Sequence, residues 1–155
     1  MPGIRGDSPA KHGSVTEASM IPASNLTRQR LLDLRYSLLR LHKILLDTER
    51  VSYDETHAPI ASSAEFLQLV LGDDWFAYLR PLSQLVVRID ETLDEGELLT
   101  EEDAGAFLDQ AHGLLRSPEM GKGLGPRYSE ALQRNPDVVL AHAEVVKILR
   151  NGPPA

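Results

Sequence analysis

The chain has 155 residues, of which 42% are hydrophobic and 25% are charged, a composition typical of a globular protein and not of a disordered or membrane-embedded one. It contains no cysteine, which excludes disulfides, thiolate nucleophiles, cysteine-ligated zinc and iron–sulfur clusters. The formal net charge is −7, and this acidic balance argues against general nucleic-acid binding, which needs a basic surface to displace counterions from phosphates.

The two ends of the chain differ in composition from the middle. Residues 1–23 are rich in glycine, proline, serine, alanine and threonine and have no periodic apolar pattern, so we predict a flexible tail. We expect residues 152–155 to be a second, short tail that follows a single domain over residues 24–151. No apolar stretch approaches the roughly 18 residues that a membrane span needs, and none resembles the core of a secretory signal. We therefore expect a cytoplasmic protein without membrane contact.

The first predicted helix is the longest and runs from about residue 24 to residue 50, with Ser24 or Asn25 as its N-cap. Its leucines fall into two rows with a spacing of seven residues: Leu31, Leu38 and Leu45 in one row, and Leu32, Leu39 and Leu46 in the other. The chain breaks at residues 57–59, because the residue before a proline disfavours helical backbone.

Two further helices are predicted in the middle of the chain. Ser62 and Glu65 form a capping-box pattern, which predicts a short helix over about residues 64–71. A third helix follows, and its apolar residues continue in helical register through Pro81, which predicts one helix with a kink at the proline. That apolar register consists of Trp75, Leu79, Leu82, Val86, Ile89 and Leu93.

The remaining pattern also predicts helices. Thr100 is the expected N-cap of a fourth helix, and a glycine-rich linker over residues 117–125 follows it. A short helix over 126–134 leads to Asn135, the expected N-cap of a final helix that ends near Arg150. The sequence therefore predicts an all-α fold: a compact antiparallel bundle of about four long helices and two short ones.

Four polar residues of the first helix, Arg28, Arg35, His42 and Glu49, repeat every seven residues between the two leucine rows, and we call them the polar seam. Three interpretations remain open: a cleft between neighbouring helices, a buried network satisfied by acids of the third helix, or the lining of a ligand or partner groove. His42 lies about 10.5 Å along the axis from either seam neighbour, too far for a direct hydrogen bond. We therefore predict a partner from another helix, with Asp90 as the first choice.

Two Asp-x-x-His pairs, Asp54 with His57 and Asp109 with His112, mark the positions at which a metal site would lie. Di-iron bundles use Glu-x-x-His instead, and this chain has none. We therefore expect no resident cofactor. His142 lies on the apolar stripe of the last helix and is predicted to be a core histidine that is bonded to a backbone group or an acid.

No catalytic motif is present, and residues 64–110 carry 12 acidic against two basic side chains. These observations predict a non-catalytic interaction or regulatory module whose partner is another protein or a second copy of the chain. The alternative is a ligand- or metal-binding bundle, and possibly an enzyme, that uses the polar seam or the Asp-x-x-His pairs.

Overall fold

A computed structural model describes residues 21–94, 98–116 and 123–151, and its regular elements there are all helices. They are α2 (Asn25–Thr56), α3 (Ser63–Gly72), the 3-10 helix η1 (Asp74–Leu79), α4 (Arg80–Asp94), α5 (Glu101–Leu114), α6 (Pro126–Arg134) and α7 (Pro136–Arg150). The predicted all-α bundle is confirmed. Residues 1–20 and 152–155 of the predicted tails, and residues 117–122 of the predicted linker, lie outside the described residues.

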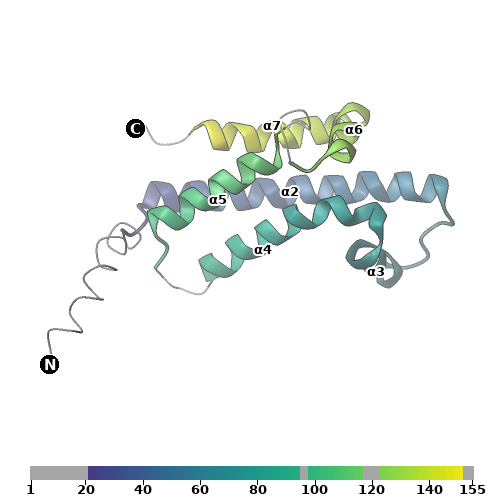
Figure 1. The fold of residues 1–155 in the computed structure, drawn as a ribbon, viewed down its shortest axis with the longest axis horizontal. Helices are drawn as coiled ribbons and strands as arrows, with labels where there is room; N and C mark the ends of the chain where they lie inside the picture. The colour runs from purple at the N-terminus through teal and green to yellow at the C-terminus, as the bar shows by residue number, and fades with distance from the viewer. Residues whose placement is uncertain (1–20, 95–97, 117–122, 152–155) are drawn as a thin grey trace, which may run out of the picture.

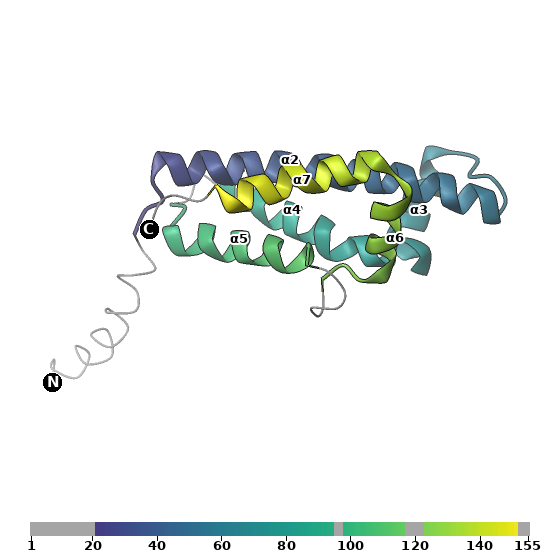
Figure 2. The ribbon, with the colours of Figure 1, turned by 90° about the horizontal axis from the view of Figure 1, so that it is seen from above.

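Helix α2 is the longest element, and α4, α5 and α7 run along it (Figures 1 and 2). Helix α7 is antiparallel to α2, since Asn135 before its first turn bonds Thr48 whereas its last turn meets Arg30. The Arg30 guanidinium donates to the carbonyl oxygens of Ile148 and Leu149 at 3.1 and 2.8 Å. These carbonyls have no partner within their own helix, so Arg30 closes the end of α7 against the start of α2.

The core is centred on one face of α2. The fully buried leucines of α2 are Leu31, Leu34, Leu38, Leu41 and Leu45. They have the alternating spacing of three and four residues that lines one side of a helix. Leu34 and Leu41 lie on the side of this stripe away from the polar seam, while Leu39 of the second predicted row is exposed. The seam therefore runs along the edge of the buried face and not down its middle, as the two leucine rows had suggested.

The predicted kinked third helix is wrong in its first half. Residues Asp74–Leu79 form the 3-10 helix η1, and α4 begins only at Arg80. Pro81 therefore stands in the first turn of α4, where its missing N–H would have had no partner within the helix. Helix α2 also extends past the predicted end at residue 50 to Thr56.

The last three residues of the predicted N-terminal tail are part of the fold. The backbone N–H of Ala23 donates to Leu99 O at 2.8 Å, and Glu101 N–H donates to Ile21 O at 2.9 Å, around an isolated antiparallel bridge between Pro22 and Thr100. The Glu101 carboxylate also accepts from the N–H of Ser24 at 2.7 Å. These bonds hold the start of α2 against the start of α5, so residues 21–23 belong to the fold and not to the tail.

Candidate functional site

The structure divides the polar seam into separate environments. Arg28 is half-buried near the start of α2 and has no side-chain hydrogen bond within the described residues. Arg35 Nη1 donates to Asp90 Oδ1, an ion pair that joins α2 to α4 with both side chains partly exposed. His42 lines a cavity, and Glu49 is completely buried.

The predicted pairing of His42 with Asp90 is wrong, because Asp90 bonds Arg35 instead. Helices α2 and α4 are antiparallel, and the Arg35–Asp90 pair fixes which residues face each other. Seven residues further along α2, His42 therefore meets the beginning of α4 near Ser83, and both line the same cavity. Sequence spacing identified the right acid for the seam but assigned it to the wrong seam residue.

Glu49 is the buried centre of a cluster with Tyr78, Arg127 and Arg134, which we call the Glu49 cluster. Its carboxylate has 0% exposed side-chain surface and accepts from Tyr78 Oη at 2.6 Å and from Arg127 Nη2 at 2.7 Å. Arg134 Nη2 lies 3.4 Å from the same carboxylate. A buried charge is costly unless it is paired and hydrogen-bonded, and both conditions are met here.

The partners in the Glu49 cluster are themselves held in place. The Arg127 guanidinium lies over the ring of Trp75, 4.5 Å from its centroid, and 5.5 Å from the Tyr78 ring centroid. Burial, together with the hydrogen bond to Glu49, raises the pKa of Tyr78 well above its usual value, so the phenol stays a hydrogen-bond donor. The cluster joins α2, η1 and α6 with its charges satisfied, which is the arrangement of a structural network.

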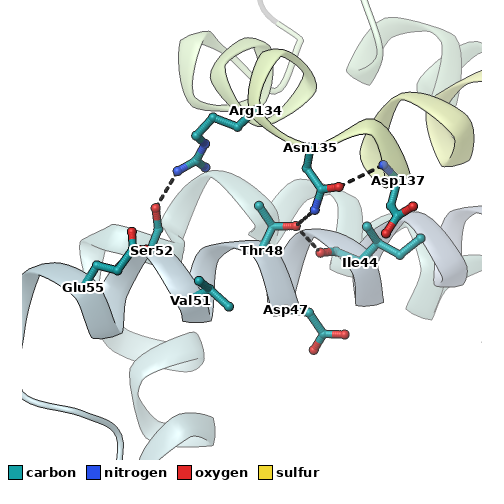
Figure 3. Close-up of a pocket in the computed structure, with 9 residues that line it drawn as sticks. All are labelled: Ile44, Asp47, Thr48, Val51, Ser52, Glu55, Arg134, Asn135 and Asp137. Carbon is teal, nitrogen blue, oxygen red and sulfur yellow. Dashed lines mark hydrogen bonds between the residues drawn. The ribbon is translucent and has the colours of Figure 1, made fainter.

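Beside this cluster lies an open groove of about 400 Å³ between α2 and the corner where α6 meets α7 (Figure 3). Arg134 donates to Ser52 Oγ, and Asn135 Nδ2 donates to Thr48 Oγ1 at 2.8 Å. Thr48 Oγ1 in turn donates to the carbonyl oxygen of Ile44. The polar groups along the groove thus bond one another, and they attach the α6–α7 corner to α2.

A second cavity, of about 190 Å³, is formed by α2, α3, η1 and α4, and we call it the His42 cavity. It is lined by His42, Val70, Leu71, Phe76, Leu79, Arg80, Ser83 and Gln84. Burial lowers the pKa of His42 below 6.5, so its ring is neutral at neutral pH. Arg80 Nη2 makes only a long contact of 3.4 Å with Asp73 O, and its buried Nε has no partner.

The two Asp-x-x-His pairs are placed apart from the seam. Asp54 Oδ1 accepts from the N–H of Ile60 at 3.1 Å, and His57 is stacked on Tyr53 with their ring centroids 4.0 Å apart. The side chains of the second pair, on α5, are exposed. Across residues 21–94, 98–116 and 123–151, no group of three or more His, Cys, Asp or Glu side chains is placed to hold a metal ion.

His142 lies half-buried on α7, and its Nδ1 is 2.6 Å from the Tyr128 hydroxyl. The prediction is right that His142 has a hydrogen-bond partner, but the histidine is half-buried at the edge of the core and its partner is a phenol, not a backbone group or an acid. Burial lowers the pKa of His142 and raises that of Tyr128.

Within the part of the chain that the structure describes, no helix combines the length and the apolar character needed to cross a membrane. Comparison of the chain with models of known protein families, with curated proteins and with solved structures finds no match.

Proposed function

We propose that the protein is a non-catalytic interaction module that binds another protein chain through helix α3. The observation that carries the proposal is that helix α3 is rich in apolar residues but has none that is buried. Five of its ten residues are bulky and apolar, yet none of the ten is buried. They are Phe66, Leu67, Leu69, Val70 and Leu71. Phe66, Leu69 and Val70 are half-buried against the core, whereas Leu67 and Leu71 are exposed. An exposed apolar patch on a folded protein is typical of a binding surface.

Helix α3 is fixed on one side and open on the other. Phe66 packs edge-on against Phe76 of η1, with the ring centroids 5.8 Å apart, and the Arg50 guanidinium lies over the Phe66 ring. Leu67 and Leu71, spaced by one helical turn, are 57% and 68% exposed. A pair of leucines at this spacing on a held helix is the arrangement by which one helix binds into a groove of a partner.

The polar clusters support a binding role more than a catalytic one. In the polar seam, Arg35 and Glu49 already bond charged partners, which leaves neither free for proton transfer. The alternative of a ligand-binding bundle keeps one supporting observation, since His42 of the seam lines a cavity.

Site-specific photo-crosslinking tests the proposal. A photoreactive benzoylphenylalanine replaces Leu67 on α3 or, as the matched control, Leu26 in the first turn of α2, which is 78% exposed. In cells that produce the protein naturally, we expect one discrete adduct from position 67 and none from position 26. The adduct's mass identifies the partner, and an adduct of twice 17.1 kDa would be a second copy of the chain. Absence of any adduct from position 67, or the same adduct from both positions, would refute the proposal.

A further inference from the structure

The His42 cavity has two chemically distinct sides. One side is apolar and consists of Val70, Leu71, Phe76 and Leu79, contributed by α3 and η1. The other side is polar and consists of His42, Arg80, Ser83 and Gln84, contributed by α2 and the beginning of α4. An apolar cavity with a few convergent polar groups is the usual form of a small-molecule site.

The charge on the polar side comes from Arg80. Unlike Arg35, Arg40 and Arg127, Arg80 has no carboxylate within ion-pair distance among the described residues. Its buried Nε has no hydrogen-bond partner, and a buried donor left in this state is unfavourable. A guanidinium presents its N–H groups as a planar fork that a carboxylate fills with two parallel hydrogen bonds.

The other polar groups are placed around that guanidinium. Arg80, Ser83 and Gln84 are spaced by three and four residues, so they share one face of α4. His42 faces them from α2, and as a neutral ring it supplies one donor and one acceptor. Among the described residues that line the cavity there is no carboxylate, so no lining side chain repels a bound anion.

We infer that the His42 cavity binds a short aliphatic carboxylate, with the carboxylate on Arg80 and the alkyl group against α3 and η1. The volume of about 190 Å³ lies below the roughly 300–1,000 Å³ of sites for drug-sized ligands, which restricts the alkyl group to a short one. The cavity shares Val70 and Leu71 of α3 with the proposed protein-binding helix, but the test of that proposal uses Leu67, which does not line the cavity.

The direct test follows the histidine ring signals of the wild-type protein by nuclear magnetic resonance during titration with isovalerate to about 10 mM. We expect a saturable shift of the His42 signals and none for His142, which is bonded to Tyr128 elsewhere. Isovaleramide has the same shape without the charge, and inorganic phosphate has the charge without the alkyl group. Neither compound should bind as tightly as isovalerate. No saturable shift of His42, or equal binding by the amide or by phosphate, would overturn the inference.

Variants test the assigned role of the guanidinium. Arg80→Met should weaken isovalerate binding on the order of 10-fold or more, because a charge-assisted bond is lost. Arg88→Met is the matched control, since it removes an arginine of the same helix that bonds Gln110 and should leave binding unchanged. If Arg80→Met does not fold, Ser83→Leu keeps the charge but fills the cavity, and it should abolish the His42 shift. Unchanged affinity in the folded variant would overturn the inference.

Discussion

Arg127 makes two kinds of contact at once. Its guanidinium donates to the buried carboxylate of Glu49, and it also covers the ring of Trp75. Because Glu49 has no exposed surface, it cannot replace a lost protein partner with bulk water. The opposite holds for Arg40 and Glu144, whose ion pair is 3.6 Å long and more than half exposed on both sides.

Arg127→Met should therefore lower the free energy of unfolding by about 2 kcal/mol or more, because it leaves a buried carboxylate short of a partner. Arg40→Met, the control, should change it by about 0–1 kcal/mol, as is usual for surface ion pairs. Urea denaturation of both variants provides the measurement. Equal losses in the two variants would mean that Glu49 is stabilised mainly by Tyr78 and Arg134.

At the scale of helices, α7 is attached to α2 at both of its ends. Arg30 binds the final carbonyls of α7, and Asn135 acts at its beginning in two ways. The Asn135 Oδ1 accepts from the N–H of Asp137, which caps the helix, and its Nδ2 donates to Thr48 of α2. One side chain thus starts the helix and sets its position on its neighbour.

Asn135→Ala should lower the free energy of unfolding by about 1–2 kcal/mol, because it removes the cap and the interhelical bond together. Asn135→Asp preserves a capping oxygen but lacks the amide donor to Thr48, so it should lose less stability than Asn135→Ala. Thermal denaturation followed by circular dichroism compares the two. A larger loss in the Asp variant would contradict the role given to the cap.

Helix starts could be predicted from the sequence because capping is a local interaction. Ser24, Ser62, Thr100 and Asn135 each accept from an N–H two or three residues ahead, at the positions that the sequence pattern indicated. The 3-10 helix η1 was missed because its apolar residues keep nearly the same register as an α-helix. Spacing alone does not distinguish the two helix types over six residues.

The partners of Glu49 could not be predicted in the same way, because they depend on how helices are placed against one another. Tyr78, Arg127 and Arg134 lie 29, 78 and 85 positions from Glu49 in the chain. The heptad repeat did identify Glu49 as a residue facing inward. The requirement that a buried carboxylate be paired predicted that partners exist, but no sequence signal selected α6 as their source.

For the molecule as a whole, stability should depend on pH through His42 and His142, the two half-buried histidines among the described residues. Burial lowers the pKa of both His42 and His142 from 6.5, the value expected in an unfolded chain. As the pH falls below about 6.5, the unfolded chain therefore binds protons that the folded chain does not. The free energy of unfolding must decrease over this range, and the neutral rings contribute their full stability only above it.

His42→Gln should reduce the loss of stability between about pH 7.5 and pH 5.5, since the variant lacks one of the groups that resist protonation. His112→Gln, which changes an exposed histidine of α5, is the matched control. The measurement is the urea midpoint of the wild type and of each variant at both pH values. A pH dependence unaltered by His42→Gln would show that this ring is as easily protonated in the folded state as in the unfolded one.

The pairing of α2 with α7 also has a consequence for the protein while it is being made. Arg30 and the carbonyls that it binds are separated by 118 and 119 positions, so a ribosome must add all the intervening residues before this contact can form. Until then, the leucine face of α2 lacks one of its covering helices. A growing chain must therefore keep a long apolar helix from binding other chains, and contacts this distant in sequence slow the closing of the bundle.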